Sequence, residues 1–101
     1  MSTYYKNKKT GKIVEYPPYE CKICGQYKIE FPHDICPICG WEDDSVQNND
    51  HEYWGGANQM TFNQYKKFWK ENKDNILKNI KTNPFYAIDL SKKYYKEHFN
   101  K

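Results

Sequence analysis

The chain has 101 residues, of which 38% are hydrophobic and 18% aromatic, and its net charge is +3. A chain this short and polar is expected to form one domain and cannot bury a large apolar core, so it needs a further source of stability. No run of residues reaches transmembrane length, and residues 1–12 lack the apolar stretch of a signal peptide. We therefore expect a cytoplasmic protein with no membrane partner.

The charge is unevenly distributed along the chain. Residues 1–28 hold six lysines and two acids (+4), residues 29–65 no lysine and seven acids (−7), and residues 66–101 ten lysines and four acids (+6). All the basic residues are lysine, so the chain lacks the arginine fork that reads guanine and binds phosphate in a bidentate manner. Base-specific recognition of nucleic acid is therefore disfavoured.

Residues 1–18 predict an N-terminal pair of short strands. Tyr4-Tyr5 and Ile13–Tyr16 have strand-like composition, and residues 7–12 between them contain a turn sequence. A basic arm without fixed structure is the alternative, because terminal segments often have none. Pro17-Pro18 ends any strand and leads into the next segment.

All four cysteines lie within residues 19–42, as two C-x-x-C pairs that are each followed by glycine: Cys21 and Cys24, then Cys36 and Cys39. Two thiolates three residues apart can bind one metal ion from a tight turn, and glycine lets the backbone take the positive φ that this turn needs. Two such turns predict a closed site of four thiolates around zinc. A structural zinc site contributes roughly 10–16 kcal/mol of folding free energy, so we expect that the protein folds only with the metal bound.

Other uses of the cysteines remain open. Disulfides would suit an oxidising compartment, and a thioredoxin-like dithiol would need one C-x-x-C pair rather than two. Iron is the alternative metal, because the two pairs resemble the ligand signature of rubredoxin, although the linker between them is short for that fold. Electron transfer is therefore a weaker hypothesis than structural zinc.

Between and after the cysteine pairs we expect a strand and then an ordered loop. Residues 27–31 alternate with period two, which predicts a half-buried strand with Tyr27, Ile29 and Phe31 facing inward, followed by a turn at residues 32–34. Residues 41–58 are too acidic and glycine-rich for a helix, so this stretch predicts an ordered acidic loop. Trp41 is expected to cover the metal site with apolar bulk.

From Thr61 onward the pattern is helical. Thr61 and Gln64 form a capping box, and five apolar residues then recur at helical spacing: Phe62, Tyr65, Trp69, Ile76 and Ile80. Asn72 and Lys73 interrupt this stripe, so a break near Asn72 is expected. A second helix, with Leu90 and Tyr94 on its apolar face, is expected to begin near Asp89 or Ser91 after Pro84 stops the first. The apolar stripe should lie against the cysteine ribbon.

These motifs together resemble the cysteine-rich CPCC family of small bacterial proteins, over about residues 19–70. The matching positions are Cys21, Cys24, Gly25, Cys36, Pro37, Cys39, Gly40, Trp41, Glu42, Asp43, Asp44, Val46, Gln47, Asp50, Tyr53, Gly55, Gly56, Ala57 and Asn58. One departure is clear, since the family's first pair is usually Cys-Pro-Cys-Cys and here it is Cys21-Lys22-Ile23-Cys24. The resemblance implies a zinc-ribbon-like fold with a helical extension, and an association with bacterial toxins.

We therefore expect a small α+β fold, in which zinc-ribbon or rubredoxin-like β-hairpin knuckles carry a C-terminal helical extension. The single domain divides into an arm (residues 1–18), a zinc ribbon with acidic loop (19–58) and helices (59–101). No catalytic arrangement is evident, because a four-cysteine metal site leaves no open position for substrate. The acids Glu42, Asp43, Asp44 and Asp50 could instead bind a hard cation in a small hydrolase.

The favoured function is non-enzymatic binding of a basic protein through an acidic, aromatic surface, with an immunity-type inhibitor of a bacterial toxin as its sharpest version. The expected contact residues are Trp41, Glu42, Asp43, Asp44, Asp50, Tyr53 and Trp54. Nucleic-acid binding through the lysine-rich flanks is the alternative, disfavoured because the acidic block repels phosphate.

Overall fold

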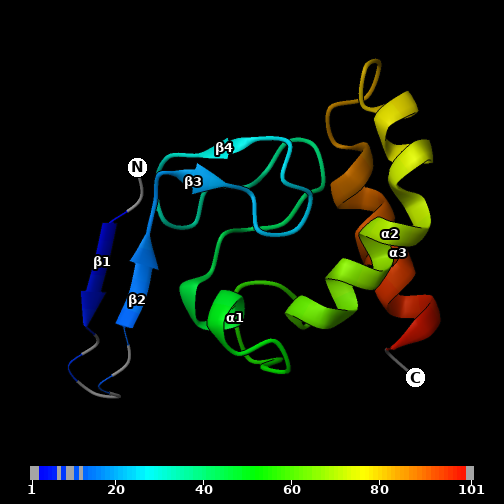
Figure 1. The fold of residues 1–101 in the computed structure, drawn as a ribbon. Helices are drawn as coiled ribbons and strands as arrows, with labels where there is room; N and C mark the ends of the chain where they lie inside the picture. The colour runs from blue at the N-terminus through cyan, green and yellow to red at the C-terminus, as the bar shows by residue number, and fades with distance from the viewer. Residues whose placement is uncertain (1–2, 7, 9–10, 12, 100–101) are drawn as a thin grey trace.

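The computed structural model describes residues 3–6, 8, 11 and 13–99, and the described chain forms a small α+β fold. Three parts lie side by side in a flat molecule of 40 × 33 × 17 Å (Figure 1). An N-terminal hairpin lies at one end, the cysteine ribbon in the middle and a pair of helices at the other end. In the described part of the chain, none of the helices combines the length and apolarity needed to cross a membrane.

The N-terminal hairpin consists of β1 (Thr3–Lys6) and β2 (Ile13–Tyr16), paired antiparallel with Thr3 opposite Tyr16. The predicted strand pair is therefore confirmed. Most of the predicted turn, at residues 7, 9, 10 and 12, lies outside the described residues. Strand β2 ends before Pro17-Pro18, as expected, and the chain continues directly into the ribbon.

The ribbon has shorter strands than the alternating sequence predicts. Strand β3 (Tyr19–Glu20) pairs antiparallel with β4 (Lys28–Ile29), and Ile35 forms an isolated bridge with Glu42. The predicted strand over residues 27–31 is wrong at its ends, since Ile29 is buried but Tyr27 and Phe31 are 40% and 63% exposed. Pairing stops because the carboxylate of Asp34 accepts hydrogen bonds from the backbone N–H groups of Glu30 and Phe31, which bends the chain.

A short helix, α1 (Ser45–Asn49), stands where the sequence predicts only a loop. Asp44 is its N-cap and accepts hydrogen bonds from the backbone N–H groups of Val46 and Gln47. The loop prediction is wrong because the acids stand before the helix, where they cap it, and not within it. The next turn begins at Asp50, whose side chain accepts the N–H of Glu52.

The first long helix, α2 (Phe62–Asn79), begins at the predicted capping box of Thr61 and Gln64. The predicted break near Asn72 is wrong, because the Asn72 side chain donates to the Phe68 carbonyl and the helix continues to Asn79. Five side chains of this helix are buried: Phe62, Tyr65, Phe68, Trp69 and Ile76.

The last helix, α3 (Tyr86–His98), begins earlier than the predicted Asp89 or Ser91. The turn before it is set by Asn83, whose side-chain and backbone oxygens accept the N–H groups of Phe85 and Tyr86. Helix α3 lies alongside α2 (Figure 1). The Tyr94 ring packs 5.2 Å from the Phe68 ring between their centroids, and the Tyr94 hydroxyl donates to Glu71.

Helices α2 and α3 cover the second cysteine turn, so the predicted contact between the apolar stripe and the ribbon is confirmed. The Tyr65 hydroxyl donates to the Cys39 carbonyl at 2.6 Å, and Gly40 lies against Tyr65 and Ile88. Helix α2 also contacts the first cysteine turn, where Lys66 donates from Nζ to the carbonyl of Ile23 at 3.0 Å. The division into residues 1–18, 19–58 and 59–101 of a single domain stays a prediction.

Candidate metal centre

The two cysteine pairs form turns of matching geometry. In the first, Gly25 donates its N–H to the Cys21 carbonyl at 2.9 Å, and in the second, Gly40 donates to the Cys36 carbonyl at 2.8 Å. Both glycines have positive φ, +67° and +85°, which side chains disfavour. The first cysteine of each turn also donates its own N–H to a carbonyl beyond the turn, Cys21 to Tyr27 and Cys36 to Trp41. The paired turns therefore present their sulfurs toward one point.

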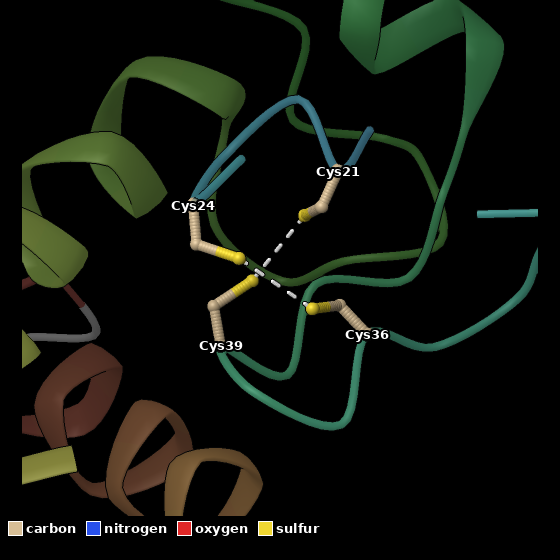
Figure 2. A group of neighbouring side chains, drawn as sticks. All are labelled: Cys21, Cys24, Cys36 and Cys39. Atoms are coloured by element: carbon tan, nitrogen blue, oxygen red, sulfur yellow. Dashed lines mark hydrogen bonds between the residues drawn. The ribbon is translucent and has the colours of Figure 1, made fainter. Parts of the chain in front are cut away.

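The four Sγ atoms lie within 4.8 Å of one another (Figure 2). The Cys21–Cys39 and Cys24–Cys36 sulfur pairs are each 3.6 Å apart. Four sulfurs at ~2.3 Å from one tetrahedral ion lie about 3.8 Å from each other, so the observed spacing matches that edge. A disulfide needs about 2.05 Å, and all four cysteines are free. The predicted ligand set is thus gathered in a geometry that could bind one metal ion.

The thiols sit in a crowded and largely buried environment that pushes their pKa values apart. The hydrogen bond from Cys24 lowers the pKa of Cys21, whereas burial raises the pKa of Cys39. One divalent cation would stabilise all four as thiolates, and four soft sulfur donors suit zinc or iron. With every position of a tetrahedral ion taken by protein, such a site is closed and structural.

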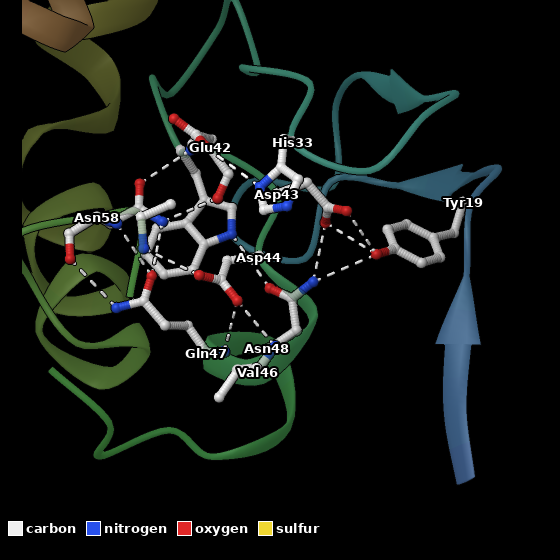
Figure 3. Close-up of polar contacts among 11 residues, drawn as sticks. Tyr19, His33, Glu42, Asp43, Asp44, Val46, Gln47, Asn48 and Asn58 are labelled. Atoms are coloured by element: carbon white, nitrogen blue, oxygen red, sulfur yellow. Dashed lines mark hydrogen bonds and ion pairs between the residues drawn. The ribbon is translucent and has the colours of Figure 1, made fainter. Parts of the chain in front are cut away.

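A buried polar network adjoins the second turn (Figure 3). Asp43 accepts hydrogen bonds from the Tyr19 hydroxyl at 2.8 and 2.9 Å and from Nδ2 of Asn48 at 2.8 Å. Asn48 in turn accepts the indole N–H of Trp41. Burial raises the pKa of the Asp43 carboxyl, and the hydrogen bonds from Asn48 and Tyr19 oppose that rise. Asp43 therefore fastens β3 to the segment that follows the second cysteine pair.

Gln47 holds a second part of this network together. Its Nε2 lies 3.2 Å from each of the carbonyls of Tyr53, Asn58 and Met60, and its Oε1 accepts from the backbone and side chain of Asn58. Asn58 also accepts the N–H of Glu42 and donates to the Glu42 carbonyl. A Cβ at Gly56 would stand 2.5 Å from Cδ of Gln47, so only glycine lets the loop close over this amide.

The structure corrects the predicted contact surface. Trp41, Asp43 and Asp44 are only 0%, 2% and 8% exposed, so placing them on an exposed acidic surface is wrong. Trp41 packs its ring against Phe62 and Tyr65 instead, at centroid distances of 5.7 and 5.1 Å. The reason is hydrogen bonding: partners distant in sequence satisfy the two carboxylates and make their burial possible.

Four of the predicted contact residues retain accessible surface. Glu42 is partly exposed and pairs with His33 at 3.3 Å, while Asp50, Tyr53 and Trp54 are exposed. The acids do not gather into a second metal site, because within the described residues only the four cysteines cluster with metal-binding spacing. Sequence reasoning missed Tyr19, Gln47, Asn48 and Asn58 as structural partners, although Gln47 and Asn58 belong to the motif that resembles the family, which is a signal that could have found them.

No curated protein matches the chain. A family model described as Cysteine-rich CPCC matches residues 19–81, which span the ribbon, α1, the following loop and α2. That range contains the four clustered cysteines and the whole Gln47–Asn58 network. The first turn keeps Lys22 and Ile23 between its cysteines, as the sequence shows. Because the match covers more than half of its length, the chain belongs to the cysteine-rich CPCC family.

Proposed function

We propose that this is a non-enzymatic, zinc-stabilised interaction module whose acidic, aromatic loop binds a basic protein. The observation that carries the proposal is Trp54, which is 79% exposed although it belongs to a firmly held loop. An exposed tryptophan leaves a large apolar surface in contact with water, which is unfavourable for the free protein. Tryptophan is also among the residue types enriched at the contacts that dominate binding energy. Its exposure on an ordered loop supports a binding role.

The loop that carries Trp54 is held on both sides. Gln47 donates to the carbonyl of Tyr53, immediately before Trp54, and Asp44 accepts the N–H of Ala57, three residues after it. The N–H of Tyr53 donates to the Asp50 carbonyl at 3.1 Å. A preorganised loop loses little conformational freedom on binding, so more of the contact energy appears as affinity.

The charge around this loop favours a basic partner. Asp50 and Glu52 are exposed and close to Trp54 in the sequence, and residues 29–65 contain no lysine and seven acids, of which only Asp43 and Asp44 are buried. Negative potential of this kind increases the rate at which a positively charged partner associates. Occlusion of the basic site of a nuclease-like toxin is the sharpest version of the proposal. A reducing compartment, the cytoplasm, suits the free thiolates that the zinc site needs.

Zinc is proposed because a closed site of four thiolates is typical of structural zinc. Four thiolates suit iron as well, so the metal has to be identified by experiment. Metal analysis of protein purified without added metal tests it directly. One zinc per chain is expected. A coloured protein with one iron per chain would contradict the zinc proposal and indicate a rubredoxin-like site.

The binding proposal is tested with wild-type protein, Trp54→Ala and Phe85→Ala as baits in nuclease-treated lysate. Phe85 is a matched control, because it is 63% exposed but lies in the turn before α3, outside the acidic loop. We expect a basic protein to be retained by wild type and Phe85→Ala and lost with Trp54→Ala. Equal retention by all three baits, or retention of acidic proteins only, would contradict the proposal.

A further inference from the structure

A second charged surface of the molecule has the opposite sign. A groove of about 530 Å³ runs between the first cysteine turn and α2, and its lining consists of Ile23, Lys66, Lys67, Trp69, Lys70 and Lys73. Four of these six residues are lysines, and none is acidic. Since α2 rises ~1.5 Å per residue, Lys66 and Lys73 lie roughly 10 Å apart along the helix axis. The groove therefore presents a row of positive charge.

The floor of this groove is fixed by the fold, whereas its charges are free. Ile23 and Trp69 are buried, and Lys66 is anchored by its hydrogen bond to the Ile23 carbonyl. Lys67, Lys70 and Lys73 are exposed, and within the described residues none of them lies in an ion pair with a carboxylate. Glu71 and Asp74 are the nearest acids along the helix, but neither lines the groove, and Glu71 accepts the hydroxyl of Tyr94 instead. The ammonium groups of Lys67, Lys70 and Lys73 are thus available to an anionic ligand, and Lys66, which uses one of its three donors on Ile23, can supply a fourth contact.

We propose that this lysine groove binds the phosphate backbone of nucleic acid without regard to base sequence. Ile23 and Trp69 are only 3% and 7% exposed, so a peptide would gain little apolar contact here. A nucleic-acid backbone does not need apolar contact, because its affinity comes mainly from the release of counterions. Lysine binds phosphate as a point charge, and without arginine the groove cannot read bases in a bidentate manner. This surface is separate from the Trp54 loop.

The test is fluorescence anisotropy of a labelled single-stranded oligonucleotide with the metal-loaded full chain at several salt concentrations. Four phosphate contacts predict a slope of log K against log salt of about −2.8, so affinity should fall roughly 50-fold between about 50 and 200 mM salt. The variant K67Q/K70Q/K73Q should retain one contact and a slope of about −0.7. Its affinity should then fall only about 3-fold over the same range.

The matched control is K92Q/K93Q/K96Q, which removes the same charge from α3, outside the groove. It should keep a slope close to that of wild type, and Trp54→Ala should bind the oligonucleotide unchanged. Equal slopes for the two lysine variants would overturn the groove, because net charge alone would then explain binding. Absence of binding at about 50 mM salt, or tighter binding of poly-glutamate of the same charge, would overturn it too.

Discussion

The substitution Gln47→Leu tests whether the polar network is part of the framework. Gln47 is fully buried and makes five hydrogen bonds, three of them to the carbonyls of Tyr53, Asn58 and Met60. Leucine has a similar volume, so packing is largely kept while these groups lose their partner. Nε2 has two hydrogens to share among these three carbonyls, and leucine also removes the acceptor of two N–H groups of Asn58. Each buried group left without a partner costs ~1–3 kcal/mol, so a loss of about 3 kcal/mol is a low figure.

The assay is urea unfolding of the metal-loaded protein, followed by circular dichroism and tryptophan fluorescence. With an m value of about 1.5 kcal/mol/M, the loss should lower the midpoint by about 2 M. Gln59→Leu is the matched control, because it is the same substitution at an exposed side chain one residue beyond Asn58. If Gln47→Leu unfolded within about 0.5 kcal/mol of Gln59→Leu, the network would not stabilise the fold and the reasoning would be refuted.

Three further predictions follow from the cysteine turns and the helix pair. Chelation, or Cys36→Ser, should abolish stoichiometric metal binding and unfold the ribbon, with loss of the near-ultraviolet circular dichroism signal. The reason is that a structural zinc site, as proposed here, would contribute roughly 10–16 kcal/mol of folding free energy, which is as much as the whole stability of a small domain. An unchanged spectrum would contradict this. Gly40→Ala should destabilise by about 2–3 kcal/mol in urea unfolding and Gly25→Ala by about 1, since both have positive φ but only a Cβ at Gly40 meets Tyr65, 2.8 Å from its hydroxyl; equal losses would remove the steric argument. Burial raises the pKa of the Tyr94 hydroxyl from 10.0 to about 12, so the stability that this hydroxyl contributes is complete below pH 10 and is lost as pH rises toward 12. The free energy of unfolding relative to that of Tyr94→Phe should therefore fall over that interval. Parallel pH curves for the two proteins would contradict the assignment.

The features that the sequence predicts correctly are local ones. Two C-x-x-C-Gly turns specify their own backbone, and bringing them together only requires a hairpin between them. The capping box of Thr61 and Gln64 is likewise complete within four residues. The N-terminal strand pair follows from two short apolar runs joined across a turn. In each case the determining residues are close in sequence, so no knowledge of the fold is needed.

The features that sequence reasoning misses depend on partners distant in the chain. Asp43 is buried because Tyr19, 24 positions earlier, donates to it, and Asp44 because Ala57, 13 positions later, does. Composition alone predicts a solvated acidic loop at these positions. Helix α1 has five residues, too few to establish a period of 3.6, so only its N-cap reveals it. The break predicted near Asn72 does not occur, because the Asn72 side chain donates a hydrogen bond to the Phe68 carbonyl and this residue stays within the helix.

This buried network changes how the family's motif is interpreted. Trp41, Asp43, Asp44, Gln47, Gly56 and Asn58 all belong to the match, and each packs or hydrogen-bonds inside the molecule. Replacing Asp43 or Asp44 would therefore reduce stability and binding together, and the two effects could not be separated. Trp54 and the lysines at 67, 70 and 73 have no evident structural task, because they are exposed and without partners among the described side chains. Residues that the fold does not need are the ones whose substitution can separate function from stability, so both binding proposals are tested on them.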